Sequence, residues 1–176
     1  MKTNLKTSKS NRSRAALCGE YAMYISLAFI FSYLESLIPL PLPFPGIRLG
    51  LANIVIVIVL YRQGFLSALG ISAVRNILTA LTFGNPYMFL YSMTGSILSL
   101  IVMDVLKKNT KLSIPSISCA GGIFHNMGQL LIAMLTVSTS ALWGYLPILY
   151  FTGAITGILM GVIAHECIRR IRHLTI

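Results

Sequence analysis

The stretch GIFHNMGQLLIA, residues 122–133, places three hydrogen-bonding side chains inside an otherwise apolar run. His125, Asn126 and Gln129 share one face of a predicted helix with Gly122, because spacings of 3, 4 and 7 residues return to the same side of a helix. Imidazole and carboxamide groups can hydrogen-bond a polar ligand or one another. The chemistry that this face offers is therefore binding, either of a solute or of a neighbouring helix.

Arg75 is a second candidate for such a site, because it lies about ten residues into a predicted helix that begins at Phe65. At 1.5 Å per residue, it is roughly 15 Å from the start of that helix. If the helix crosses a membrane, this depth is near the midplane, where a charge costs about 2.5 kcal/mol or more. Such a residue needs a partner or a ligand. We assign four further residues to the same predicted substrate-binding site: Arg48, Asn53, Asn76 and Tyr91.

Two interpretations of these polar residues remain open. In the first, they satisfy one another: Arg75 pairs with Glu35, and the polar face of residues 122–133 bonds across helices, as polar groups do between membrane helices. In the second, they line a polar cavity that opens outward and takes a small, anionic solute. For the set as a whole we favour the cavity, since Arg48, Arg75 and the polar face exceed what one Glu35 could neutralise.

The composition is that of an integral membrane protein. Of the 176 residues, 56% are hydrophobic and 10% are charged, and the mean hydropathy is +0.80, whereas a soluble domain carries about 25% charged residues. Too few polar side chains are present to cover a water-soluble surface. Six membrane-spanning helices fit the apolar runs, at about residues 17–38, 47–61, 65–83, 87–106, 117–137 and 146–168.

The second of these helices is predicted to be short. A full crossing takes about 20 apolar residues, whereas residues 47–61 supply about 15, and the prolines of PLPFP (41–45) favour an extended connection before them. The composition predicts a basic, disordered tail at residues 1–14, a single six-helix transmembrane domain at 15–172 and a short tail at 173–176. The predicted fold class is therefore all-α, polytopic and membrane-embedded.

The net charge of +10 is unevenly distributed along the chain. Twelve of the fourteen basic residues stand at four places: before the first predicted span and after the second, fourth and sixth. If the chain threads back and forth, all four places fall on one side, and the positive-inside rule makes that side cytoplasmic. We expect a bacterial cell-membrane protein, surrounded by the lipid bilayer, with both termini in the cytoplasm. No nucleic-acid partner is needed to explain its charge.

Several chemistries are disfavoured by the residues present. Only four are acidic, namely Glu20, Glu35, Asp104 and Glu166, and a diphosphate bound with magnesium needs clustered carboxylates because the ion takes several oxygen ligands. No GxxxxGK[ST] loop for nucleotide phosphates occurs. The three cysteines are far apart and lack metal-ligand spacing. We therefore expect no catalysis, no cofactor and no metal site.

A stripe of small residues lies on the first predicted helix, near its cytoplasmic end. Ala15, Gly19, Ala22 and Ser26 share one face because Gly19, Ala22 and Ser26 follow Ala15 by 4, 7 and 11 residues. Small residues let another helix approach closely. The stripe either packs within this chain or docks a partner subunit, and the residues leave both interpretations open.

Three segments resemble a known family: PGIRLGLANIVIVIVLY (45–61), RNILTALTFGNPYMFLYSMTGSILSLIVM (75–103) and GGIFHNMGQLLIA (121–133). Together they resemble the Gx transporter family, also named heptaprenyl diphosphate synthase component I, over about residues 17–170. The positions that carry the resemblance are Gly46, Arg48, Gly50, Asn53, Arg75, Asn76, Gly84, Asn85, His125, Asn126, Gly128 and Gln129.

This family is similar in turn to the substrate-binding S components of energy-coupling factor transporters. The resemblance implies six helices, a solute bound toward the outer face, and small residues on the first helix that dock a transmembrane coupling subunit joined to ATPase subunits. Ser26 departs from a strict Ala-xxx-Ala pattern after Ala22, although it is still small. Our first expectation is an S-component-like, substrate-binding subunit of an energy-coupled uptake transporter for a small anionic solute.

Two alternatives stay open beside it. The older family name implies a role in menaquinone biosynthesis, with the catalytic subunit of a prenyl diphosphate synthase as partner. This chain would then be a non-catalytic membrane companion, since the carboxylates that hold a diphosphate are missing. The other alternative is an accessory subunit of a quinone- or flavin-linked redox system, although the chain carries no flavin or quinone signature.

Overall fold

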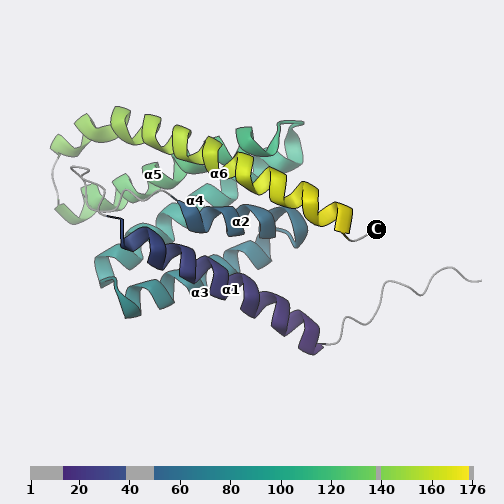
Figure 1. Ribbon diagram of the computed structural model, residues 1–176. Helices are drawn as coiled ribbons and strands as arrows, with labels where there is room; N and C mark the ends of the chain where they lie inside the picture. Colours follow the sequence, from purple (N-terminus) through teal and green to yellow (C-terminus); the bar gives the residue numbers. More distant parts are fainter. Residues whose placement is uncertain (1–13, 39–49, 138–139, 175–176) are drawn as a thin grey trace, which may run out of the picture.

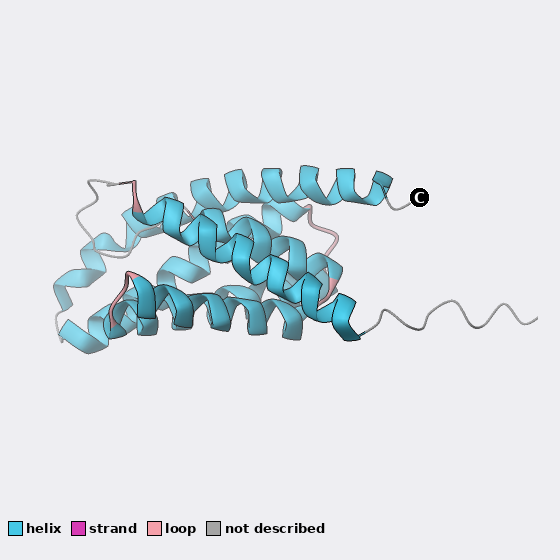
Figure 2. Cartoon of the chain, turned by 60° about the horizontal axis from the view of Figure 1, so that its bottom comes forward, coloured by secondary structure: helices cyan, strands magenta, loops and turns pink. Residues whose placement is uncertain are grey.

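The computed structural model describes residues 14–38, 50–137 and 140–174, whose helices pack side by side in a bundle (Figure 1). All regular secondary structure in these ranges is helical (Figure 2), which confirms the predicted all-α fold. Each predicted span has its helix. In chain order the elements are α1 (Arg14–Ser36), α2 (Leu51–Arg62), α3 (Phe65–Thr82), α4 (Pro86–Asn109), α5 (Ile114–Val137), the 3-10 helix η1 (Ser140–Tyr145) and α6 (Leu146–Leu174).

The surface of the bundle is apolar where that of a soluble protein would be polar. Large hydrophobic side chains stand exposed on the long helices, among them Leu66 and Leu81 on α3, Leu135 on α5 and Phe151 on α6. Extensive exposed apolar surface of this kind marks contact with lipid. Within the described ranges, α1, α3, α4, α5 and α6 are each long and apolar enough to cross a bilayer. The chain is therefore a polytopic membrane protein, as its composition predicts.

α2 is the central helix of the bundle. Its residues from Ile54 to Leu60 are all buried, and it packs against α1, α3 and α6. A helix that is apolar on every side is stable where other elements surround it. With 12 residues, α2 is roughly 18 Å long, which is less than the hydrocarbon thickness of about 30 Å. The predicted short second helix is confirmed, and residues 47–49 of its predicted range lie outside the described part of the chain.

Glycines bring α5 and α6 into backbone contact. A Cβ atom on Gly157 of α6 would lie 2.5 Å from the carbonyl oxygen of Ser118 on α5. Further along the same interface, a Cβ atom on Gly153 would lie 2.7 Å from the carbonyl oxygen of Gly122. Ordinary contacts of a Cβ atom begin at 3.4 Å, so no side chain fits at either place. Small residues are the usual means by which membrane helices approach this closely.

α4 joins α5 through a second glycine contact. A Cβ atom on Gly128 of α5 would lie 2.9 Å from the Cα atom of Gly95 on α4, and one on Gly95 would lie 2.8 Å from the carbonyl oxygen of His125. α4, α5 and α6 therefore form one closely packed set, and α1, α2 and α3 contact one another beside it. The two sets meet where α2 packs on α6 and α3 packs on α4.

The two described ends of the chain lie at the same end of the bundle (Figure 1), which we call the terminal end. α2 and α4 also finish there, and Lys107 of α4 connects them. Its Nζ atom donates a hydrogen bond to the carbonyl oxygen of Leu60 at 2.7 Å and lies 5.0 Å from the ring centroid of Tyr61. At the opposite end, Asn85 is the N-cap of α4, and its Oδ1 atom accepts a hydrogen bond from the backbone N–H of Met88 at 2.8 Å.

Two helices continue past their predicted ends at the terminal end. α4 runs to Asn109 and α6 to Leu174, beyond the predicted limits near residues 106 and 168. Basic residues end the apolar runs, but they also suit the last turns of a helix because cations stabilise its C-terminus. Lys108 in addition pairs with Asp104, one turn earlier on α4. The hydropathy pattern therefore marks where the apolar run stops rather than where the helix stops.

Candidate functional site

A small polar cavity of about 40 Å³ lies between the helices. Every α-helix contributes to its wall, so the cavity exists only in the folded bundle. A water molecule needs about 10–15 Å³, so this volume corresponds to about three water molecules or one compact polar group. The described residues that line it are Glu35, Gly50, Asn53, Arg75, Ser92, Gly122, His125, Asn126, Gln129 and Thr156.

The cavity reaches the N-terminus of α2. Gly50 is the N-cap of this helix and has a φ of +79°, a left-handed conformation that glycine adopts without strain. Its backbone N–H donates a hydrogen bond of 2.6 Å to Oε1 of Glu35. The first N–H groups of a helix lack partners within the helix and carry partial positive charge. The carboxylate of Glu35, a residue that is 6% exposed, therefore lies where negative charge is stabilised.

Arg75 lines the cavity from α3 and is held by the residue that follows it. Its Nη2 atom donates a hydrogen bond of 2.5 Å to Oδ1 of Asn76. Asn76 in turn donates from Nδ2 to the hydroxyl of Ser96 on α4 at 3.2 Å. Both Arg75 and Asn76 are buried. This chain of polar groups keeps the guanidinium inside the bundle and away from the lipid-facing surface.

The polar face predicted for residues 122–133 does point into the bundle, because His125, Asn126 and Gln129 all line the cavity. Asn126 donates from Nδ2 to the carbonyl oxygen of Leu149 on α6 at 2.8 Å. Gln129 as a residue is nine-tenths buried, and its carboxamide makes no hydrogen bond within the described part of the chain. Asn126 thus bonds to a neighbouring helix while it also lines the cavity, whereas Gln129 contributes to the cavity wall without such a bond.

Most of the predicted site residues meet in space, and two of them do not line the cavity. Asn76 lies behind Arg75 and orients it. Tyr91 is half-buried on α4 and is absent from the wall, which its neighbour Ser92 joins instead. Successive residues of a helix are turned by about 100°, so a shift of one position decides which of them faces inward. Arg48 falls outside the described residues, as do Gly46 and the PLPFP segment. The predicted residues that do line the cavity are Asn53, Arg75, His125, Asn126 and Gln129.

Besides Ser92, two further side chains of the wall, those of Glu35 and Thr156, were missed by sequence reasoning as members of the site. Glu35 was considered only as a charge partner for Arg75, but it lines the same cavity and contacts the start of α2. Thr156 is the contribution of α6, and its hydroxyl donates to the backbone carbonyl of Thr152 at 2.8 Å. A lone threonine in an apolar helix carries no sequence signal for a site, because such back-bonding is common in any membrane helix.

The small-residue stripe of α1 lies on the surface of the bundle. Ala15, Gly19, Ala22 and Ser26 are all exposed, and a Cβ atom on Gly19 would meet nothing within 4 Å. α1 instead packs into the bundle through another face, which includes Tyr24. Packing against the described residues of this chain therefore does not account for the stripe.

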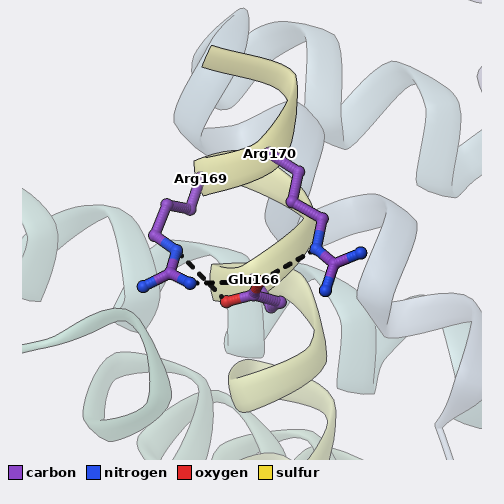
Figure 3. Close-up of polar contacts among 3 residues, drawn as sticks. All are labelled: Glu166, Arg169 and Arg170. Carbon is purple, nitrogen blue, oxygen red and sulfur yellow. Dashed lines mark hydrogen bonds and ion pairs between the residues drawn. The ribbon is translucent and has the colours of Figure 1, made fainter. Parts of the chain in front are cut away.

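The acidic residues are dispersed through the bundle. Glu35 lines the cavity, whereas Asp104 and Glu166 pair with basic residues of their own helices. Figure 3 shows Glu166 between Arg169 and Arg170, with 2.9 Å from Nε of Arg170 to Oε1 of Glu166. Among the residues that the structure describes, no three His, Cys, Asp or Glu side chains gather as metal ligands would.

Comparison with known proteins gives one match. A family model described as heptaprenyl diphosphate synthase component I matches residues 24–167. This range runs from the middle of α1 almost to the end of α6 and includes every described residue of the cavity wall. The family resemblance inferred from the three sequence segments is thereby confirmed. No curated protein and no solved structure matches the chain.

Proposed function

The chain belongs to the heptaprenyl diphosphate synthase component I family, and from that membership we propose that it is a non-catalytic membrane subunit working with the catalytic subunit of a prenyl diphosphate synthase. The family match over residues 24–167 carries this proposal. It favours this role over the uptake role that the sequence first suggested. A membrane subunit would hold the synthase at the bilayer, where a product with a long apolar chain is soluble.

The positions of the carboxylates support a non-catalytic role. A diphosphate and its magnesium ions are held by several carboxylate oxygens at once. Glu20 and Glu35 are 15 residues apart on α1, which is roughly 22 Å along a helix. Asp104 and Glu166 are engaged by basic residues one turn away on their own helices. The diphosphate chemistry would accordingly belong to the partner subunit.

The terminal end is the surface that we assign to the cytoplasm, where a soluble synthase would meet it. Exposed basic side chains gather there, including Arg62, Lys108 and Arg170, and such residues mark the cytoplasmic side of membrane proteins. In a variant without native cysteines, Lys111→Cys should react with an impermeant maleimide only after the cells are opened. Trp143→Cys, at the opposite end, should react in intact cells, and the reverse pattern would overturn this orientation.

Purification of the tagged chain from native membranes tests the subunit role. We expect mass spectrometry to identify the catalytic subunit of a prenyl diphosphate synthase among the co-purifying proteins. Reversal of charge at the terminal end, by Arg62→Glu with Lys108→Glu, should lower its recovery. The double variant Ser26→Ala with Ala22→Ser, on the exposed stripe of α1, is the control and should leave recovery unchanged. Absence of the synthase, from membranes that contain it, contradicts the proposal.

A second candidate is an S-component-like, solute-binding subunit of an energy-coupled uptake transporter, and the polar cavity favours it. The carboxamide of Gln129 lines this cavity and has no described partner. The exposed stripe of α1 would be available to a transmembrane coupling subunit that carries the ATPase subunits. At about 40 Å³, the cavity admits one compact polar group, so a larger solute would require the helices to move apart.

The same purification separates the two candidates. Recovery of a coupling subunit with paired ATPases would support the uptake role. Ala22→Leu should then abolish that recovery because a bulky side chain on a small-residue face keeps a partner helix away. Met23→Leu is the matched control, since Met23 is exposed beside the stripe and is already large. Equal recovery with both variants would exclude the stripe as the docking face.

A further inference from the structure

Glu35 holds the place in the cavity where the negative charge of a ligand would be most stable. Its Oε1 atom accepts the backbone N–H of Gly50 at 2.6 Å, and this N–H belongs to the N-terminus of α2, which favours anions. Arg75 lines the same small cavity. Arg75 and the helix terminus are thus parts of one cavity wall, and a carboxylate of the chain itself occupies the helix terminus.

The charges of the described wall are nearly balanced. Glu35 supplies one negative charge and Arg75 one positive charge, and His125 is the remaining titratable side chain. Inside a membrane, an uncompensated charge is costly, so a second negative group in this wall would compete with the Glu35 carboxylate for the N-terminus of α2. An anionic ligand that reaches this helix terminus therefore has to displace the Glu35 carboxylate, which already accepts the N–H of Gly50.

Gln129 contributes a further hydrogen-bonding side chain to the same cavity wall. Gln129 is 9% exposed and lines the cavity, and its carboxamide makes no hydrogen bond within the described part of the chain. A carboxamide that faces a cavity and forms no hydrogen bond within the protein is left to bond whatever fills that cavity. This carboxamide is independent of the α2 terminus, and it gives the cavity a second group that can hydrogen-bond a polar ligand.

We propose that the cavity binds the carboxylate or phosphate group of a small solute, and that this group displaces the Glu35 carboxylate from the N-terminus of α2. Glu35 is then an internal stand-in for the ligand. The bound oxyanion accepts hydrogen bonds from the backbone N–H of Gly50 and the carboxamide of Gln129, beside the charge of Arg75. This inference rests on the second candidate function, whose cavity it uses, and it identifies the chemical class of the solute.

Binding of acetate and of inorganic phosphate to the purified full-length protein tests the inference, by calorimetry at constant ionic strength. Glu35→Gln keeps an oxygen that can accept from Gly50 but removes the competing charge. We expect this variant to bind one of the two anions at least roughly tenfold more tightly than the wild type, the size expected when a competing charged hydrogen bond is removed. Preference for acetate or for phosphate then identifies the ligand group.

Two further variants make the result specific. Glu166→Gln makes the same chemical change at the terminal end and should leave anion binding unchanged. Gln129→Leu, combined with Glu35→Gln, should reverse most of the gain in affinity because it removes a donor while preserving volume. If Glu35→Gln does not fold, Glu35→Asp takes its place. It keeps the charge but shortens the side chain, so it competes less well for the N–H of Gly50 and should also tighten anion binding.

The inference is overturned if the Glu35 variants bind both anions within about threefold of the wild type, a difference of less than 1 kcal/mol. It is equally overturned if Glu166→Gln produces the same gain, because net charge would then be the cause. A neutral solute that co-purifies with the wild type, together with no effect at Glu35, would leave the uptake role standing and remove only this inference. Recovery of partner subunits is measured separately and tests the proposed functions themselves.

Discussion

Replacing Gly157 by alanine adds one methyl group where α6 has no room for it. The new Cβ atom would lie 2.5 Å from the carbonyl oxygen of Ser118 and 2.9 Å from the Cα atom of Cys119. Both neighbours are backbone atoms of α5, so no rotation of a side chain relieves the overlap. To restore a contact of 3.4 Å from one of 2.5 Å, the helices must separate by about 0.9 Å. Overpacking of this kind destabilises a protein by about 1–3 kcal/mol.

The same displacement would reach the cavity, because α5 carries part of its wall. Asn126 donates to the carbonyl oxygen of Leu149 across this interface at 2.8 Å. A separation of the helices by close to 1 Å would lengthen that hydrogen bond beyond the normal limit of about 3.2 Å. The Gly157→Ala variant should therefore lose stability through packing and, in addition, loosen one polar group of the cavity.

Thermal unfolding of the purified protein in detergent is the assay. For a chain of this length, 1–3 kcal/mol corresponds to a fall of roughly 2–12 °C in the unfolding midpoint. Gly70→Ala is the matched control, since a Cβ atom on Gly70 of α3 would meet nothing within 4 Å. Alanine is also the better helix former by about 0.5–1 kcal/mol, so this variant should unfold at the wild-type temperature or slightly above it.

The outcome that refutes this reasoning is a Gly157→Ala midpoint within about 1 °C of the wild type, which corresponds to less than 1 kcal/mol. α5 and α6 would then not be in backbone contact at this point. A fall of equal size for Gly70→Ala would also refute it, because the loss would follow from replacing any helical glycine rather than from the interface.

Three other changes can be measured by the same unfolding assay. Asn85→Ala removes the N-cap of α4 and should lower the free energy of unfolding by about 1 kcal/mol. Asn85→Ser can still cap the helix, so it should retain most of the stability. Equal losses of stability in the two variants would exclude capping. Lys107→Met breaks the hydrogen bond to the end of α2 and should destabilise the protein by about 1 kcal/mol. Lys108→Met should destabilise it less, because the ion pair of Lys108 is exposed and contributes little. The opposite order of stability would be inconsistent with these contacts. Asn126→Leu removes a hydrogen bond between α5 and α6 and should cost about 0.6–2 kcal/mol, and an unchanged midpoint would show that this bond does not stabilise the interface.

The sequence by itself was sufficient for the class of protein and for the existence of its helices. In lipid, backbone N–H and C=O groups must find partners within the chain, so an apolar run in a membrane protein forms a helix almost regardless of residue type. The β-branched run IVIVIV of α2 illustrates this, since it is helical despite its high strand propensity. The polar face of residues 122–133 was equally predictable, because helical period alone places its members on one side.

Only the tertiary structure decided which helix faces meet. Helical period relates residues to their own axis, but it does not define how far each helix is rotated or shifted against its neighbours. That choice depends on close contacts such as Gly157 on Ser118, in which the absence of a side chain allows one particular approach. The resulting packing of the helices turns Ser92 rather than Tyr91 toward the cavity, and it leaves the small-residue stripe of α1 exposed. The meeting of Glu35 with the N-terminus of α2 likewise depends on how α1 and α2 pack, which the hydropathy of either helix does not determine.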